Sequence, residues 1–146
     1  MLIILEGLDK SGKTTFAQRF GSDAIYYHSD AETDTMKMFR QAYKASLRED
    51  KPVILDRSFM SEIAYGTAYR NDVKLTQEEY EVIVERLVAI PHIILYFKRP
   101  ISKCKFEDNE FESDTSKLSY TAYIYSQLIS DLKDKLNIYE VKYYDW

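Results

Sequence analysis

Short apolar runs alternate with segments of helical periodicity along the whole chain. The runs Leu2–Leu5 and Val53–Leu55 contain only aliphatic residues, which is typical of strands buried on both faces. In segment 35–48, large apolar residues such as Met36 and Tyr43 recur at helical spacing, which predicts an amphipathic helix. The full pattern predicts strands at 2–5, 24–28, 52–56, 92–97 and 138–144, and helices at 14–20, 35–48, 58–69, 76–89 and 115–136.

The order of these elements predicts an α/β fold. Strands that alternate with helices form βαβ units, so we expect a parallel sheet of five strands flanked by helices on both faces. The length of 146 residues indicates a single domain over 1–146. Ligands of such sheets bind beyond the carboxyl ends of the strands. The residues that follow Leu5, His28, Leu55 and Phe97 are therefore expected to surround a site.

One motif, Gly7-Leu8-Asp9-Lys10-Ser11-Gly12-Lys13-Thr14, matches the phosphate-binding loop (P-loop) in residue type and spacing. It follows the first predicted strand and opens the first predicted helix, as this loop requires. The fold class is therefore expected to be a three-layer sandwich like that of the P-loop nucleoside-triphosphate hydrolases. The residues expected to bind the nucleotide are Gly7, Leu8, Asp9, Lys10, Ser11, Gly12, Lys13, Thr14 and Thr15.

The residue types of the loop fit phosphate chemistry. Gly7 and Gly12 allow backbone conformations that crowd a side chain, so that N–H groups can surround an anionic phosphate. Lys13 is expected to reach the outer phosphates, and the Thr14 hydroxyl is expected to ligate Mg²⁺. The loop therefore predicts nucleotide phosphates and Mg²⁺ as ligands.

A second group of candidate residues, Asp56-Arg57-Ser58, follows another predicted strand. An aspartate at that place can hold Mg²⁺ through water, and the arginine offers a planar fork for phosphate oxygens. Arg57, Ser61 and Tyr65 are spaced i, i+4 and i+8, on one face of the predicted helix. The alternative is that Asp56 only caps this helix and Arg57 is exposed.

Composition restricts the classes of partner. The net charge is −4 and the pI is about 5.3, which argues against a protein that coats nucleic acid. No apolar run approaches membrane-spanning length, so no membrane association is expected. The single cysteine, Cys104, excludes an internal disulfide and fits a reducing cytoplasm, which is the expected location.

The two motifs together resemble the thymidylate kinase family. Segment 5–15 is similar to the opening of that family, and Asp56-Arg57-Ser58 with Ser61 and Ala64-Tyr65 is similar to its second motif. The resemblance covers about a fifth of the chain and implies phosphoryl transfer from ATP to a deoxynucleotide or nucleoside. It implies that Lys13 holds the donor phosphates and Thr14 the metal.

The resemblance also implies roles for two further residues. Asp9 would contact the sugar or phosphate of the acceptor, and Arg57 would bind phosphate between donor and acceptor. The predicted catalytic residues are Lys13, Asp9, Lys10, Arg57 and Asp56. The predicted acceptor-binding residues are Asp9, Arg57, Ser61, Tyr65, Glu32 and Arg40. The predicted metal ligands are Thr14 and Asp56.

The chain departs from the family pattern in the expected lid between Arg99 and about residue 116. No arginine follows Arg99 in the sequence, although Lys98, Lys103, Lys105 and Lys117 are present. Thymidylate kinases with a basic residue inside the loop tend to lack the lid arginine. Lys10 is therefore expected to compensate, as a point charge without the guanidinium fork.

The acceptor side also departs from the family pattern. Thymidylate kinases have an arginine-containing loop after the second strand, whereas here segment 29–34 is acidic. Deoxynucleoside kinases place a catalytic carboxylate there, a role open to Asp30 or Glu32. The alternative is a solvated loop that caps the next helix. Arg40 is a candidate for the missing positive charge, and Phe39, Phe59 and Tyr43 are candidates for stacking on a base.

Three functions remain open from the sequence. The leading one is a nucleotide kinase of nucleotide biosynthesis, acting on a small-molecule deoxypyrimidine monophosphate. The second is a deoxynucleoside kinase that phosphorylates a 5′-hydroxyl, and the third is a nucleotide-binding regulatory protein without turnover. A stripe of Tyr120, Tyr123 and Ile124 is expected to be helix packing or, as in the family, the face of a homodimer.

Overall fold

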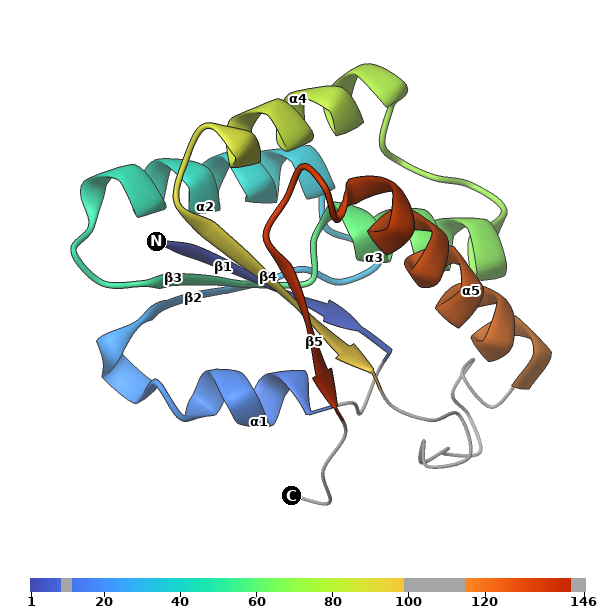
Figure 1. Ribbon diagram of the computed structural model, residues 1–146, viewed down its shortest axis with the longest axis horizontal. Helices are drawn as coiled ribbons and strands as arrows, with labels where there is room; N and C mark the ends of the chain where they lie inside the picture. Colours follow the sequence, from blue (N-terminus) through green and yellow to red (C-terminus); the bar gives the residue numbers. More distant parts are fainter. Residues whose placement is uncertain (9–11, 99–114, 143–146) are drawn as a thin grey trace.

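A parallel five-stranded sheet with helices on both faces forms the body of the molecule (Figure 1). This computed structural model describes residues 1–8, 12–98 and 115–142. The strands follow the order β2-β3-β1-β4-β5, and every neighbouring pair is parallel. The predicted α/β class and five-stranded parallel sheet are therefore confirmed.

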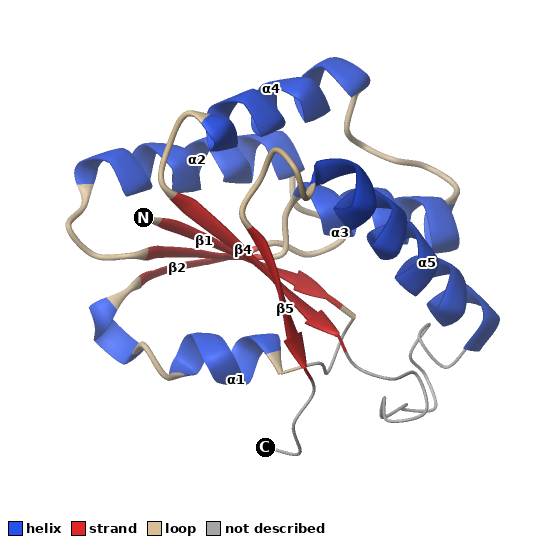
Figure 2. Cartoon of the chain, in the orientation of Figure 1, coloured by secondary structure: helices blue, strands red, loops and turns tan. Residues whose placement is uncertain are grey.

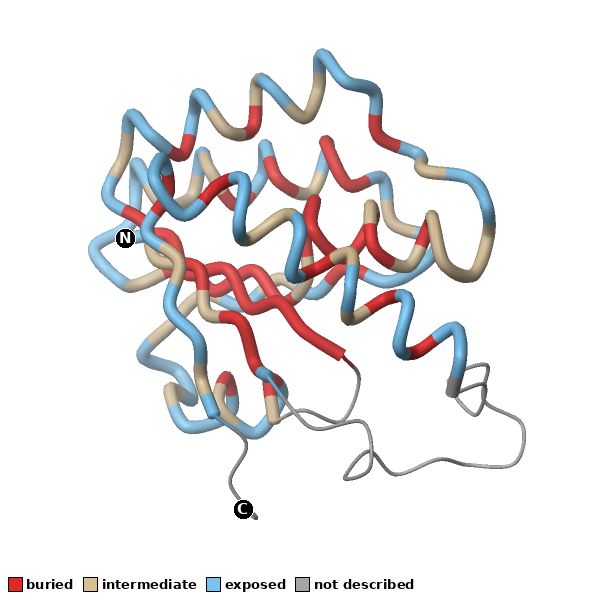
Figure 3. The backbone as a smooth tube through the Cα atoms, turned by 45° about the vertical axis from the view of Figure 1, so that its right-hand side comes forward, coloured by how far each residue is buried: buried red, intermediate tan, exposed pale blue. Residues whose placement is uncertain are grey.

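The strand bounds follow the apolar pattern of the sequence. All residues of β1 and β3 are buried, because helices cover both faces of the middle of the sheet. The edge strands β2 and β5 contain exposed positions between half-buried ones, as expected at an edge (Figure 3). The strands are β1 (Leu2–Gly7), β2 (Ile25–His28), β3 (Val53–Asp56), β4 (His92–Lys98) and β5 (Ile138–Lys142).

The helices begin at recognisable sequence signals. The carboxylate of Asp34 accepts a hydrogen bond from the backbone of Lys37 and caps α2, and Thr76 and Glu79 form the expected capping box at α4. The helix expected at 58–69 is divided into α3 and a π-helical turn, η2. The helical elements are α1 (Lys13–Gln18), η1 (Gly21–Asp23), α2 (Thr35–Arg48), α3 (Phe59–Tyr65), η2 (Gly66–Arg70), α4 (Gln77–Val88) and α5 (Thr115–Leu132).

The two helical layers differ in size. Helices α2, α3, α4 and α5 lie on one face of the sheet, and α1 lies on the other (Figures 1 and 2). The larger core is formed by the sheet and the four-helix layer, and includes Leu2, Ile4, Leu55 and Leu87, all fully buried. The smaller core under α1 contains Ile3, Leu5, Ala17, Ile54 and Phe97. Together these layers form the predicted three-layer sandwich.

Several aromatic residues lie elsewhere than the sequence suggested. Phe39 and Phe59 are 1% and 0% exposed in the core, so they are not placed to stack on a base. Tyr120 and Tyr123 are 48% and 58% exposed on α5, so the packing interpretation of that stripe is wrong for both. The α5 tyrosine that packs inward is Tyr125, because it occupies the buried face of the helix.

The parallel register brings the ends of three strands together. Leu5 of β1 is paired with Asp56 of β3, and Asp56 is paired with His28 of β2. The backbone N–H of Arg57 donates to the carbonyl of Leu5 at 2.8 Å, and that of Ser29 donates to the carbonyl of Asp56 at 3.0 Å. The segments after these strands therefore begin side by side at the carboxyl edge of the sheet.

Gly7 at the end of β1 is expected to be essential for the fold. Its φ is +135°, and an added Cβ would lie 2.6 Å from the backbone oxygen of Phe97, which cannot move without disturbing β4. We expect Gly7→Ala to lower the free energy of unfolding by about 2 kcal/mol or more. Denaturant unfolding measures this loss.

Gly21 provides the matched control for this substitution. It has a φ of +54° but no atom within 4 Å of an added Cβ, so Gly21→Ala carries backbone strain alone. If Gly7→Ala lowers the free energy of unfolding no more than Gly21→Ala does, the steric explanation is contradicted.

Candidate functional site

Two adjoining hollows lie at the carboxyl edge of the sheet. We name them after the substrates that the sequence predicts there. The smaller is the donor pocket, with a volume of about 120 Å³, and the larger is the acceptor pocket, with a volume of about 590 Å³. His28 and Arg57 line both. The donor pocket is lined by Gly12, Lys13, Thr14, Thr15, His28, Asp56 and Arg57. The acceptor pocket is lined by His28, Ser29, Asp30, Ala31, Thr35, Arg57, Ser58, Ser61, Glu62, Tyr65, Tyr69, Arg70 and Lys117.

The described part of the P-loop borders the donor pocket. Lys13 is 5% exposed, and its Nζ donates to the carbonyl of Gly7 at 3.1 Å and to that of Leu8 at 2.6 Å. Gly12 has a φ of 101°, which favours glycine, and leads the chain into α1. Thr14 and Thr15 follow on the exposed side of that helix. The predicted loop residues Asp9, Lys10 and Ser11 lie outside the described residues, as do residues 99–114 of the expected lid.

The two carboxylate oxygens of Asp56 differ in their hydrogen bonding. Its Oδ2 accepts a hydrogen bond from the hydroxyl of Tyr26 at 2.6 Å. Its Oδ1 is buried and has no hydrogen-bond partner among the residues that the structure describes, and Asp56 lines the donor pocket. Ser58, not Asp56, occupies the N-cap position of α3, so the alternative of a simple helix cap is wrong. A buried carboxylate oxygen without a partner fits a cation or its bound water.

Few of the described residues at the site offer oxygen ligands for Mg²⁺. Among the described residues, no three His, Cys, Asp or Glu side chains form a metal cluster. Mg²⁺ in phosphate-transfer enzymes is usually held by one or two protein oxygens, with the rest supplied by phosphate and water. Thr14 and Asp56, which line the same pocket, offer that donor set.

Arg57 lies at the border between the two pockets. Its backbone has a φ of 72°, an uncommon conformation for a residue with a side chain, and precedes α3 rather than belonging to it. The guanidinium lies over the ring of Tyr65, 5.0 Å from the centroid. Arg57, Ser61 and Tyr65 thus line one cavity, as their spacing suggested, although Arg57 does so from outside the helix.

Aromatic rings form one wall of the acceptor pocket. Tyr65 and Tyr69 stack with centroids 5.6 Å apart and planes at 16°. Lys117 from α5 lies 5.7 Å from the centroid of Tyr69. Tyr69 and Lys117 were not among the residues expected to bind the acceptor. Tyr69 lies four residues after Tyr65, so helical spacing could have indicated it from the sequence. Lys117 comes to this wall only through the packing of α5.

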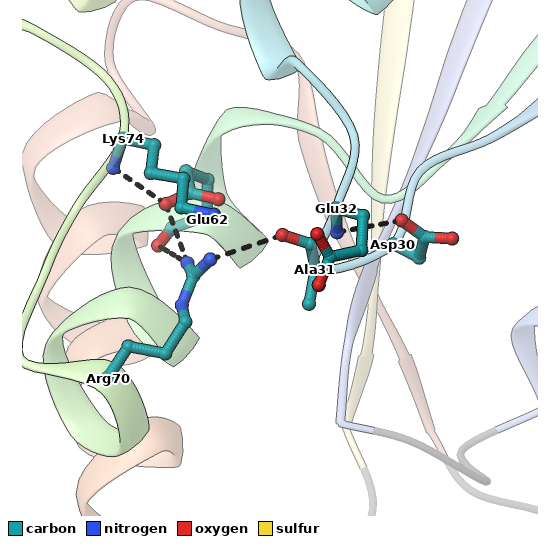
Figure 4. Close-up of polar contacts among 6 residues, drawn as sticks. All are labelled: Asp30, Ala31, Glu32, Glu62, Arg70 and Lys74. Atoms are coloured by element: carbon teal, nitrogen blue, oxygen red, sulfur yellow. Dashed lines mark hydrogen bonds and ion pairs between the residues drawn. The ribbon is translucent and has the colours of Figure 1, made fainter.

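Glu62 and Arg70, which both line the acceptor pocket, form an ion pair that the sequence did not predict (Figure 4). Arg70 Nη2 lies 2.6 Å from Oε2 of Glu62, which also accepts from the backbone N–H of Lys74 at 2.8 Å. Arg70 Nη1 donates to the carbonyl of Ala31 at 3.4 Å, which links η2 to the loop after β2. Gly66 leaves room for this guanidinium, because an added Cβ there would lie 2.9 Å from Nη2.

The acidic loop after β2 has a mainly local organisation. Asp30 Oδ1 accepts from the backbone of Glu32 at 2.8 Å and from the hydroxyl of Thr33 at 3.0 Å. These bonds lower the pKa of the exposed Asp30 carboxyl. Asp30 lines the acceptor pocket, whereas neither Glu32 nor Arg40 does. Both are exposed, Arg40 on the outer side of α2, so the structure does not bring them to the predicted acceptor site.

A fully buried carboxyl group, Glu6, lies beneath the P-loop. Its oxygens accept from the backbone N–H of Ser58 and from the hydroxyl of Ser61, the latter at 3.2 Å to each oxygen. The Ser61 hydroxyl lies 2.7 Å from that of Tyr125, which donates to the carbonyl of Gly7 at 3.3 Å. Burial raises the pKa of Glu6 to about 7, although Ser58 and the charge of Arg57 oppose the shift.

We expect Glu6 to make the stability of the protein depend on pH. In the unfolded chain the carboxyl ionises near its ordinary pKa of 4.5, whereas the folded protein keeps the proton up to about pH 7. The folded state therefore binds the extra proton between these values, and its free energy of unfolding falls as pH rises through the window. Glu6→Gln has no proton to lose, so its stability should improve relative to wild type from pH 5 to pH 7.

Denaturant unfolding at several pH values tests this expectation. Glu78→Gln, on the exposed side of α4, is the matched control. A constant difference in stability between wild type and Glu6→Gln across pH 5 to 7 would contradict it.

The chain is similar in sequence to one curated viral protein. It is 33% identical over 89 residues to the "Putative thymidylate kinase" of Acidianus bottle-shaped virus (isolate Italy/Pozzuoli). The match takes in 56% of this chain and 54% of the viral protein, so the chain spans about half the length of this curated relative. No protein-family model matches the chain.

Solved structures share the fold over almost the whole chain. The YorR protein of Bacillus subtilis, in complex with phosphorylated GDP, has a TM-score of 0.75 at 20% identity and covers 100% of this chain and 88% of its own. Thymidylate kinase from Ehrlichia chaffeensis has a TM-score of 0.60 at 17% identity, with coverages of 100% and 89%. Deoxyadenosine kinase from M. mycoides with bound dATP has a TM-score of 0.55 at 13% identity, with coverages of 97% and 91%.

These findings agree with the two sequence motifs. The viral relative confirms the resemblance to the thymidylate kinase family, and the solved structures confirm the fold. The chain therefore resembles the thymidylate kinases in sequence and shares the α/β fold of these solved structures.

Proposed function

We propose that this protein is a kinase that transfers a phosphoryl group from Mg²⁺-bound ATP to a deoxynucleoside monophosphate, as thymidylate kinases do. The observation that carries the proposal is the position of Arg57, which lines both the donor and the acceptor pocket. A guanidinium at that border can bind oxygens of both substrates. Phosphoryl transfer depends on such positioning and charge stabilisation more than on covalent chemistry.

The proposed reaction assigns a task to each pocket. ATP binds along the P-loop with its γ-phosphate beside Lys13, whose Nζ exchanges the loop carbonyls for phosphate oxygens. An oxygen of the acceptor phosphate forms a bond to the γ-phosphorus. The bond from that phosphorus to the bridging oxygen of the β-phosphate breaks, and ADP leaves. Mg²⁺ would neutralise phosphate charge, held by Thr14 and, through water, by Asp56.

The acceptor pocket favours an anionic acceptor. Arg57 and Lys117 both line it, while the carboxylate of Glu62 is paired with Arg70. The acidic Asp30 is the remaining charged residue of the lining, and its carboxylate already accepts two hydrogen bonds from its own loop. A phosphate-bearing acceptor complements this set better than a neutral nucleoside does.

The setting that we propose follows from the substrates. A kinase of free nucleotides would work in the cytoplasm, in nucleotide biosynthesis, without nucleic acid as a partner. In the part of the chain that the structure describes, no helix is long and apolar enough to span a membrane. A homodimer through the exposed tyrosines of α5, Tyr120 and Tyr123, is a further proposal.

A substrate panel tests the function directly. The protein is incubated with ATP, Mg²⁺ and each deoxynucleoside or deoxynucleoside monophosphate in turn, and formation of ADP is measured. ADP formation that depends on a monophosphate supports the proposal, and dependence on a nucleoside supports the deoxynucleoside kinase. ATP binding without turnover on any acceptor would indicate the regulatory nucleotide-binding protein instead.

Arg57→Ala is expected to lower kcat/KM for the best monophosphate about 100-fold or more, because one preorganised charge donor is lost from the transition state. The kcat/KM of Arg57→Lys, which keeps the charge but lacks the planar guanidinium, should lie between the values of wild type and Arg57→Ala. The control is Arg48→Ala on the exposed side of α2. Steady-state kinetics with the folded variants make the comparison, and near-normal kcat/KM in Arg57→Ala would remove Arg57 from the mechanism.

The deoxynucleoside kinase remains a second candidate because Asp30 lines the acceptor pocket. A 5′-hydroxyl needs a base to take its proton, whereas a phosphate oxygen does not. If the acceptor is a monophosphate, Asp30→Asn should change kcat less than threefold. If Asp30 is a catalytic base, kcat should fall about 100-fold or more. Glu32→Gln, two residues along the loop and outside the pocket lining, is the comparison variant.

A further inference from the structure

The hydroxyl of Tyr26 makes a short hydrogen bond to a residue of the donor pocket. It donates to Oδ2 of Asp56 at 2.6 Å, the usual length of a hydroxyl bonded to an ionised carboxylate. Tyr26 comes from the edge strand β2 and Asp56 from the end of β3. The contact therefore joins two strands at the border of the site.

The register of the two strands explains how this contact forms. Tyr26 is paired with Ile54, and His28 with Asp56, so Tyr26 and Asp56 are diagonal neighbours on one face of the sheet. The ring of Tyr26 stacks with that of His28, with centroids 6.5 Å apart and planes at 21°. This stacking holds the tyrosine ring along the strand, with its hydroxyl toward the carboxylate.

The contact leaves the Asp56 carboxylate with a defined orientation. Because Oδ2 is bound to Tyr26, rotation of the carboxylate would break a short hydrogen bond. The other oxygen, Oδ1, is buried and has no hydrogen-bond partner within the described part of the chain. Asp56 is 1% exposed and lines the donor pocket. A buried unpaired carboxylate oxygen is costly unless a ligand completes it.

We propose that Tyr26 is a positioning residue for the metal site: its hydroxyl fixes the Asp56 carboxylate so that Oδ1 receives Mg²⁺ or a water bound to it. The inference rests on the proposed function, because it takes Mg²⁺ with ATP as the ligand of the donor pocket. Residues that orient a ligating carboxylate in this way affect metal affinity without touching the metal.

The protonation of Tyr26 agrees with this role. Burial and the hydrogen bond to Asp56 raise the pKa of the Tyr26 hydroxyl well above its ordinary value of 10. The hydroxyl therefore remains a donor throughout the neutral range.

Tyr27→Phe provides a matched control on the same strand. Tyr27 is the next residue of β2, and its side chain packs on the opposite face of the sheet, against the larger core. The same atom is removed in Tyr26→Phe and Tyr27→Phe, but only Tyr26 contacts Asp56. Tyr26→Leu is a second variant that also lacks the hydroxyl, and Asp56→Asn removes the carboxylate charge.

The experiment measures how the melting temperature rises with MgCl₂ at a fixed ATP concentration, for the full chain and each variant. We expect Tyr26→Phe and Tyr26→Leu to need about 10-fold more Mg²⁺ for half of the rise, by analogy with other residues that orient metal ligands. Asp56→Asn should need at least as much, and Tyr27→Phe should match wild type. Binding of ATP without Mg²⁺ should be the same in wild type and Tyr26→Phe.

Three outcomes would overturn the inference. A Mg²⁺ midpoint of Tyr26→Phe within twofold of wild type would refute the positioning role but not the proposed function. Unfolding of both Tyr26 variants without nucleotide would show that the hydroxyl maintains the sheet edge instead of the metal site. If wild type itself gave no Mg²⁺-dependent rise with ATP, the proposed function would fail and this inference with it.

Discussion

The hydrogen bonds of the buried Glu6 carboxyl connect the P-loop to the helices that carry the rest of the site. Glu6 is the last residue but one of β1, and it accepts from the backbone of Ser58 and the side chain of Ser61. Ser61 in turn contacts Tyr125 of α5, which donates to the carbonyl of Gly7. Through this one group, the end of β1, the start of α3 and the middle of α5 have fixed relative positions.

The position of Arg57 depends on the same arrangement. Its backbone N–H donates to Leu5 and the next N–H donates to Glu6, so the chain after β3 is bound to the end of β1 at two successive residues. These bonds stabilise the uncommon backbone conformation of Arg57, with a φ of 72°. The guanidinium then reaches Tyr65 at the border of the two pockets. Backbone strain at this residue thus coincides with the place where two substrates would meet.

The two pockets are organised by different kinds of contact. The donor pocket is bordered by the P-loop and by the ends of β2 and β3, which the hydrogen bond from Tyr26 joins. The acceptor pocket is assembled from η2, the loop after β2 and α5, joined by the Glu62–Arg70 pair and the stacked tyrosines. This difference fits the proposed chemistry, because phosphate is common to all donors whereas acceptors differ in size and charge.

The sequence by itself determined the features that depend on local pattern. Continuous aliphatic runs such as Leu2–Leu5 identified the central strands, since strands buried on both faces have no polar positions. The spacing of Gly7, Gly12 and Lys13 identified the P-loop, because phosphate binding constrains neighbouring residues of one segment.

Only the tertiary structure decided which side chains from distant segments meet. Tyr26 and Asp56 are 30 residues apart, and Glu6 and Ser61 are 55 apart, so no local periodicity connects them. Phe39 was a candidate for stacking on a base, but α2 packs it against the sheet, where it is buried. The same orientation of α2 leaves the next residue, Arg40, exposed. Lys117 reached the acceptor pocket only because α5 packs on α3. Pairing of strands and packing of helices, which depend on the whole chain at once, set these contacts.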